Sequence, residues 1–230
     1  MPLVAAAVCP HPPLIVPEVA TGAAAELDDL RVACEGAVRR LAGSGAATLV
    51  VLGAGEVTED HAAPGRVSFA PWGLDDPPAN LLPLSLSVGG WLVNRVLGQD
   101  ANYRMIAIAE TASPADCAAL GRRLDEDGPG PWALLVMGDG SARRGLKAPG
   151  YDDPRAPGYD MGVARALASA DLDALRDLDP ELSADLMVAG RAPWQVLAGA
   201  ARGAAWRAEL AYDDAPYGVA YFVATWERLS

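Results

Sequence analysis

Hydrophobic and polar residues follow two different periods along this chain. Short apolar runs typical of buried strands occur at Leu3–Val8, Thr48–Leu52, Tyr103–Ala109 and Trp132–Met137. Apolar residues spaced three and four apart predict helices between and after these runs. The predicted helices are Ala23–Leu41, Ser87–Leu97, Pro114–Leu124, Tyr159–Ala168, Leu172–Leu178, Glu181–Ala189 and Pro193–Ala201. Two last runs, Trp206–Tyr212 and Val219–Trp226, predict a closing antiparallel pair of strands.

The alternation of strands and helices predicts an α/β fold. We expect a mainly parallel central sheet with helices on both of its faces. Residues 1–230 form one domain in this interpretation, because no repeat or interdomain linker divides them. Two long segments rich in glycine and proline, 56–83 and 141–158, predict irregular loops, and the first of them has a candidate short strand at Arg66–Ala70.

Composition narrows the classes of partner. The formal net charge of −12 and the pI near 4.5 argue against nucleic acid and against anionic membranes. No apolar run approaches the roughly 18 residues that a bilayer span needs. Three well-separated cysteines, Cys9, Cys34 and Cys117, are typical of a reducing compartment. From these features we expect a soluble cytoplasmic protein.

The first candidate for chemistry is His11, one of two histidines in the chain. Proline favours extended backbone in the residue before it, so Cys9 and His11 should both be extended and point to the same side. The segment directly follows the first predicted strand. We therefore expect the His11 imidazole at the sheet edge where α/β proteins place their sites.

A second candidate region follows the fourth predicted strand, at Gly138-Asp139-Gly140-Ser141. Arg143 stands where a dinucleotide fingerprint needs its third glycine, and no Gly-Lys-Ser/Thr phosphate loop follows. The turn is therefore interpreted as exposing Asp139, Ser141 and Arg143 at a strand end. Asp213, in a predicted hairpin turn, could face the same rim.

Four segments resemble the subunit-B-type class III extradiol ring-cleavage dioxygenases, the LigB-like family that includes the Memo group. They are Pro10–Glu18, Thr48–Leu52, the three stretches Gly138–Arg143, Ala148–Pro154 and Pro157–Asp160, and Ala189–Ala200 with Tyr217–Tyr221. The resemblance implies a LigB-like α/β fold and a mononuclear non-haem iron(II) held by two histidines and a carboxylate. It also implies a catecholate substrate, dioxygen, and a further histidine that acts as acid and base near the ring.

The chain departs from this family pattern at two of its histidines. By the resemblance, His11 aligns with the first iron ligand. The turn that carries the second ligand is Gly53-Ala54-Gly55 here, and the family's Ser-His pair is Ser141-Ala142. The usual mechanism needs three imidazoles, and this chain has two.

Two arrangements could still hold a metal. His11, His61 and either Glu56 or Asp60 could form a facial set for iron(II). Alternatively, Cys9 and His11 could join His61 and a carboxylate at a tetrahedral zinc. Either arrangement requires the 56–83 loop to fold over the strand ends.

The interpretation that we favour is a divergent LigB-like protein with an incomplete iron site and no standard cofactor. It would act as a small-molecule-binding protein or as an enzyme of altered chemistry. His11, Glu56, Asp139, Ser141 and Arg143 would line its pocket, with Arg143 orienting an anionic ligand; a phenolic ligand is the other expectation. One alternative is an active dioxygenase on small phenols that uses His11 and His61, and another is a mainly structural homo-oligomer.

Overall fold

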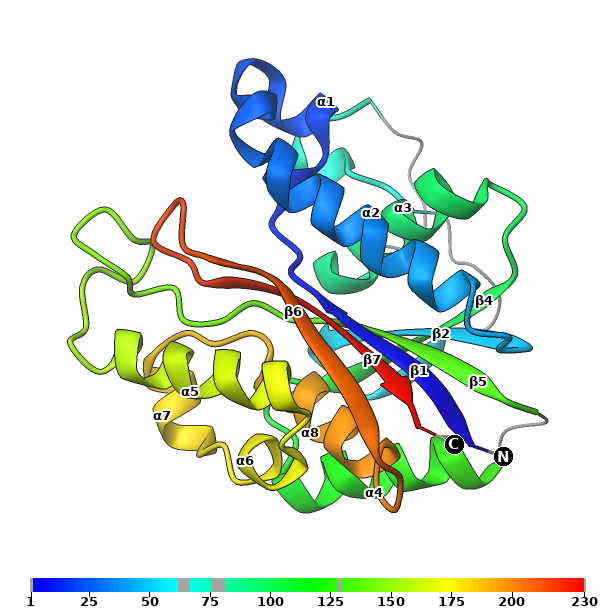
Figure 1. The fold of residues 1–230 in the computed structure, drawn as a ribbon. Helices are drawn as coiled ribbons and strands as arrows, with labels where there is room; N and C mark the ends of the chain where they lie inside the picture. Colours follow the sequence, from blue (N-terminus) through cyan, green and yellow to red (C-terminus); the bar gives the residue numbers. More distant parts are fainter. Residues whose placement is uncertain (1, 62–66, 76–81, 128–129, 230) are drawn as a thin grey trace.

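The computed structural model describes residues 2–61, 67–75, 82–127 and 130–229, and it has an α/β fold. The described residues form a seven-stranded sheet with the order β3-β4-β2-β5-β1-β7-β6 (Figure 1). The strands are β1 (Leu3–Cys9), β2 (Thr48–Gly55), β3 (Glu59–His61), β4 (Tyr103–Ala109), β5 (Trp132–Met137), β6 (Trp206–Asp214) and β7 (Tyr221–Arg228). The four central strands β4, β2, β5 and β1 are parallel. Antiparallel pairs complete the sheet at both sides: β3 with β4, β7 with β1, and β6 with β7.

Helices cover both faces of the sheet (Figure 1). One face carries α1 (Pro17–Ala20), α2 (Asp28–Ala42) and α3 (Leu84–Leu97). The other carries α4 (Pro114–Asp127), α5 (Ala156–Ser169), α6 (Leu172–Arg176), α7 (Pro180–Asp185) and α8 (Arg191–Ala200). Short 3-10 helices lie at Pro13–Ile15, Thr21–Leu27 and Ala70–Trp72.

The strands contribute to a core on each face because successive side chains point to opposite sides. In β5, Trp132, Leu134 and Val136 join the core under α4, α5 and α8. The alternate residues of the same strand, Ala133, Leu135 and Met137, join the core under α2 and α3. A strand buried on both faces reads as one continuous apolar run, as the sequence of β5 does.

The sequence-based expectation of an α/β fold with a centrally parallel sheet and a final antiparallel pair is confirmed. The candidate strand at Arg66–Ala70 is wrong for its described residues: 67–69 are irregular and Ala70 begins a 3-10 turn. The sequence analysis also missed β3, whose residues carry no apolar alternation. The predicted helix Glu181–Ala189 extends too far, since α7 ends at Asp185. Among the described residues, no helix combines the length and the apolarity that crossing a membrane requires.

Candidate functional site

A cavity of about 540 Å³ opens where the parallel strands β1, β2 and β4 end, next to the short edge strand β3. Its polar lining includes the two histidines of the chain together with three glutamates and one serine. The described lining residues are His11, Ala54, Gly55, Glu56, Val57, Glu59, His61, Leu82, Pro83, Leu84, Ser85, Ala107 and Glu110. The carboxyl edge of a parallel sheet is the usual place for a ligand in α/β proteins.

His11 is the most buried titratable side chain of this cavity. Its position is fixed from the neighbouring strand: the Gly138 N–H donates to the Cys9 carbonyl, and the His11 N–H donates to Asp139 Oδ1 over 2.7 Å. The side chain is 9% exposed, and its Nδ1 lies 3.6 Å from Asp139 Oδ1. Among the described residues this Nδ1 has no hydrogen-bond partner. A buried polar atom without a hydrogen-bond partner is uncommon, and the group next to this nitrogen is the Asp139 carboxylate.

Asp139 combines a structural and an electrostatic role beside His11. Burial raises the pKa of its carboxyl, while the charge of His11 and the hydrogen bond from the His11 N–H lower it. The Gly190 N–H donates to the Asp139 carbonyl over 2.8 Å, so backbone contacts hold this residue from a second side. Asp139 therefore orients the His11 backbone and places a carboxylate next to its imidazole. It is not among the described residues that line the cavity, although the sequence analysis expected it there.

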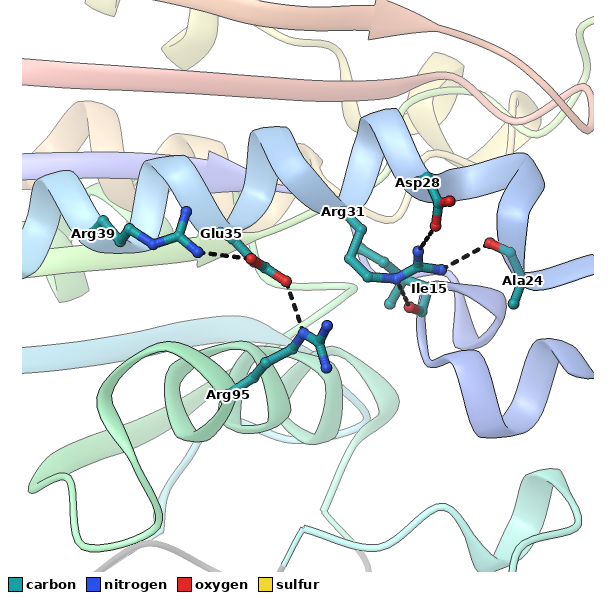
Figure 2. Close-up of polar contacts among 7 residues, drawn as sticks. All are labelled: Ile15, Ala24, Asp28, Arg31, Glu35, Arg39 and Arg95. Carbon is teal, nitrogen blue, oxygen red and sulfur yellow. Dashed lines mark hydrogen bonds and ion pairs between the residues drawn. The ribbon is translucent and has the colours of Figure 1, made fainter.

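The chain that follows His11 is held by Arg31 of α2 (Figure 2). The buried Arg31 guanidinium donates to the Ile15 carbonyl over 2.9 Å and to the Ala24 carbonyl over 3.0 Å. It also pairs with Asp28. One side chain thereby ties two points of the segment 13–27 to α2, which limits the freedom of the backbone that follows His11.

Glu35 connects the two helices on this face (Figure 2). It accepts hydrogen bonds from Arg95 of α3 over 2.7 Å and from Arg39 of its own helix over 2.8 Å. The hydrogen bond from Arg95 is the main reason that the pKa of Glu35 lies below its ordinary value. Because the beginning of α3 forms one wall of the cavity, this pair links that wall to α2.

The end of β2 has no room for larger side chains. A Cβ atom at Gly53 would lie 2.6 Å from Ser85 Cβ and closer still to Ser85 Oγ. A Cβ atom at Gly55 would lie 3.0 Å from Pro83 Cγ. Ser85 Oγ donates to the Ala54 carbonyl over 2.6 Å, which fastens the start of α3 to the strand. Packing therefore opposes a ligating side chain at Gly53, and a side chain at Gly55 would need Pro83 to shift by a few tenths of an ångström.

The edge strand β3 brings His61 to the cavity. β3 pairs antiparallel with β4, and in this pairing His61 lies opposite Met105. The neighbouring Asp60 forms an ion pair with Arg104. His61 is half-buried, and its Nε2 has no hydrogen-bond partner among the described residues. His61 is thus a cavity residue, although it stands in a polar stretch of sequence, Glu59-Asp60-His61.

Ser141 and Arg143 lie away from the cavity. Ser141 is fully buried, and Asp160 accepts hydrogen bonds from its N–H over 2.9 Å and from its Oγ over 2.6 Å. Arg143 donates to the Gly150 carbonyl over 2.6 Å within its own loop. Asp213 is exposed on β6. The structure therefore brings Glu56 and His61 to the His11 cavity and gives Ser141 and Arg143 contacts within the 141–160 region.

The described geometry does not group the side chains of the metal arrangements considered from the sequence. Cys9 lies in the core under α2, where its thiol contacts Cys34. His11, His61 and Glu56 line one cavity, but among the described residues no three His, Cys, Asp or Glu side chains are grouped closely enough to hold an ion. The facial set for iron(II) and the tetrahedral set for zinc are therefore not assembled here.

The chain matches no family model and no curated protein. Among solved structures, it is similar to the crystal structure of the uncharacterized protein JW3007 from Escherichia coli K12, with a TM-score of 0.57. The two share 15% sequence identity over 97% of this chain and 99% of the other. At this identity the likeness shows a shared fold over the full length and assigns no activity.

Sequence reasoning missed Glu59 and Glu110 as cavity residues. Glu110 follows β4, and its position at a strand end was a usable signal. Its N–H donates to the Gly55 carbonyl over 3.0 Å, and its carbonyl accepts from the buried Arg191. Glu59 depends on the pairing of β3 with β4, and no local pattern indicates that pairing.

Proposed function

We propose that this chain is a divergent LigB-like protein that binds a small phenolic molecule in the His11 cavity, with the standard iron site of that family incomplete. The sequence resemblance supports the family. The α/β fold and the position of the cavity at the carboxyl edge of the sheet are consistent with it.

The observation that carries the proposal is the burial and position of the His11 side chain. Its side chain is nine-tenths buried, it lines the cavity, and its Nδ1 has no hydrogen-bond partner among the described residues. His11 lines the cavity and 9% of its side chain is exposed, so a ligand hydroxyl in the cavity can reach the imidazole. A hydrogen bond of this kind contributes about 0.5–1.5 kcal/mol.

The remaining lining favours a phenol over the anionic ligand expected from Arg143. Leu82, Pro83 and Leu84 provide an apolar wall for a ring, and the volume of about 540 Å³ lies within the range of small-molecule sites. Arg143, the proposed anion partner, does not line the cavity and donates to Gly150 instead.

A metal-dependent dioxygenase that uses His11 and His61 is the second candidate. The observation in its favour is that both imidazoles and Glu56 line the same cavity. A rearrangement of β3 would have to bring them together, because the described geometry does not group them.

Ligand binding and metal content test the two candidates on the same protein. We expect 4-ethylphenol to bind in calorimetry and in ligand-observed NMR, and His11→Ala to weaken binding at least about tenfold, which corresponds to about 1.4 kcal/mol. His11→Gln keeps a polar side chain of similar length and controls for folding. Unchanged binding in two folded His11 variants would overturn the proposal. Stoichiometric iron or zinc in protein purified without chelators, lost in His11→Ala and His61→Ala, would favour the dioxygenase.

A further inference from the structure

We propose that β6 pairs with β6 of a second copy of this chain, so that the two sheets join into one continuous sheet across a two-fold axis. β6 is the last strand of the sheet, and none of its residues is among the described lining of the His11 cavity. The inference therefore concerns a surface separate from the proposed ligand site, and it does not depend on the proposed function.

The outer edge of β6 has no strand beside it in the described part of the chain (Figure 1). Among the described residues, backbone hydrogen bonds join β6 to β7 and to no other segment. Such an edge leaves N–H and C=O groups free to pair with another chain, and proteins usually protect it by shortness, lysine, proline or a bulge. The opposite edge strand, β3, has three residues, whereas β6 has nine and contains neither lysine nor proline.

A bulge divides β6 into a regular part and an irregular part. Its pairing with β7 is regular from Trp206 to Leu210 and then shifts before Tyr212, which leaves Ala211 without an opposite residue on β7. A bulge bends the strand and disrupts its ladder of hydrogen bonds. The five residues before the bulge are therefore the part of this edge that can accept another strand.

The regular part of β6 is complementary to itself when two copies run antiparallel about Ala208. In that register Arg207 of one copy lies opposite Glu209 of the other, and the dimer contains this pair twice. On the other face of the sheet, the half-buried Trp206 of one copy lies opposite the half-buried Leu210 of the other. Cross-strand pairs of opposite charge and of apolar side chains stabilise a sheet. A register centred on Glu209 would instead set two carboxylates opposite each other, so the charges select the first register.

The charges of this edge already form ion pairs within one chain. Arg207 pairs with Glu227 of β7 over 3.1 Å, and Glu209 pairs with Arg40 of α2 over 2.6 Å. All four side chains are more than half exposed. Pairing of two copies extends them into a row of alternating sign, Arg40–Glu209 of one copy followed by Arg207–Glu227 of the other. Complementary charges of this kind fix the partner and the register of an interface.

The size of the interface predicts a dimer that forms only as concentration rises. Five paired residues from each copy make an interface smaller than those of permanent dimers, so we expect a dissociation constant in the micromolar range. Reversing one charge of the Arg207–Glu209 pair replaces two attractions by two repulsions in every dimer. Association should then weaken at least about tenfold.

Charge reversal in the full chain tests the pairing by sedimentation velocity. We expect wild type to approach twice the 23.8 kDa of one chain as its concentration rises to about 100 μM. Arg207→Glu and Glu209→Arg should each dimerise at least about tenfold more weakly. An equimolar mixture of the two variants should dimerise again, because every position 207 then faces a position 209 of opposite charge. Arg123→Glu, exposed on α4, is the matched control and should leave the dimer unchanged.

Amide hydrogen exchange locates the interface, and circular dichroism shows whether each variant is folded. Residues 206–210 of wild type should exchange more slowly in concentrated than in dilute protein. A wild type that stays monomeric would leave this edge to a strand of a different protein and would overturn the inference. A mixture of the two folded variants that stays monomeric, or a wild-type dimer without added protection at residues 206–210, would overturn it as well. None of these results changes the expectation for 4-ethylphenol binding.

Discussion

Replacing Gly53 by alanine tests whether α3 closes the end of β2. The added Cβ would lie 2.6 Å from Ser85 Cβ and closer to Ser85 Oγ, in a wall where Ser85 Oγ also bonds to the Ala54 carbonyl. Overpacking of this kind costs about 1–3 kcal/mol. We expect Gly53→Ala to lower the free energy of unfolding by that amount.

Removing the obstructing atoms should remove most of this cost. Ser85→Gly deletes both Cβ and Oγ, at an expense of about 2 kcal/mol from the lost hydrogen bond and from glycine in a helix. In that background Gly53→Ala should cost less than about 0.5 kcal/mol. The double-mutant cycle should therefore give a coupling energy of at least about 1 kcal/mol.

Urea unfolding of the four proteins measures the cycle directly. Gly36→Ala on α2 is a suitable control, because nothing lies within 4 Å of its Cβ position, and it should stabilise the protein by up to about 1 kcal/mol. Additive effects of the Gly53 and Ser85 substitutions, within about 0.5 kcal/mol, would refute the argument that Ser85 occupies the space next to Gly53.

Three further predictions concern the surroundings of the site. Ser141→Ala should lower the free energy of unfolding by about 1–3 kcal/mol, because the buried Asp160 loses a hydrogen-bond donor; chemical denaturation measures it. Glu35→Gln should cost about 0.5–1 kcal/mol above the ordinary glutamate pKa. Since the pKa of Glu35 is lowered in the folded protein, this difference should disappear as pH falls through that lowered value, as urea unfolding at several pH values would show. Arg31→Met should cost about 2–4 kcal/mol and speed amide hydrogen exchange in residues 13–27.

Controls separate these effects from general destabilisation. Ser169→Ala removes an exposed hydroxyl bonded to the Arg165 carbonyl and should change stability by less than about 0.5 kcal/mol. A Ser141→Ala variant as stable as wild type would contradict a structural role for Ser141. A Glu35→Gln difference that persists at the lowest pH would contradict the ion-pair explanation. Exchange that rises evenly over the whole chain in Arg31→Met would argue against a local role for Arg31.

Much of the fold could be predicted from the sequence because each buried strand is marked by a local run of apolar residues. Tyr103–Ala109 and Trp132–Met137 were predicted with the bounds that the structure has. Their continuous apolar runs follow from burial on both faces. The start of α3 at Leu84 was placed three residues late, because Pro83 and the two serines carry no helical apolar stripe.

The candidate site was predictable only where it depends on strand ends. His11 and Glu56 follow buried strands, so their place at the sheet edge could be inferred. Glu59 and His61 reach the cavity through the pairing of β3 with β4, a contact between distant segments with polar sequences. Ser141 bonds to Asp160 of α5, and no local sequence pattern indicates that the loop after β5 brings these two residues together.

The central position of β1 has a consequence for how the molecule acquires its site. Its two sheet neighbours, β5 and β7, are synthesised long after it, and the hydrogen bond from His11 to Asp139 joins residues 128 positions apart. A nascent chain that ends before residue 132 offers β1 no partner from either side. Contacts of such long range slow folding. The cavity around His11 should therefore form late during synthesis. Until then both edges of β1 lack hydrogen-bonded neighbours, and the rest of the chain or a chaperone must protect the strand from aggregation.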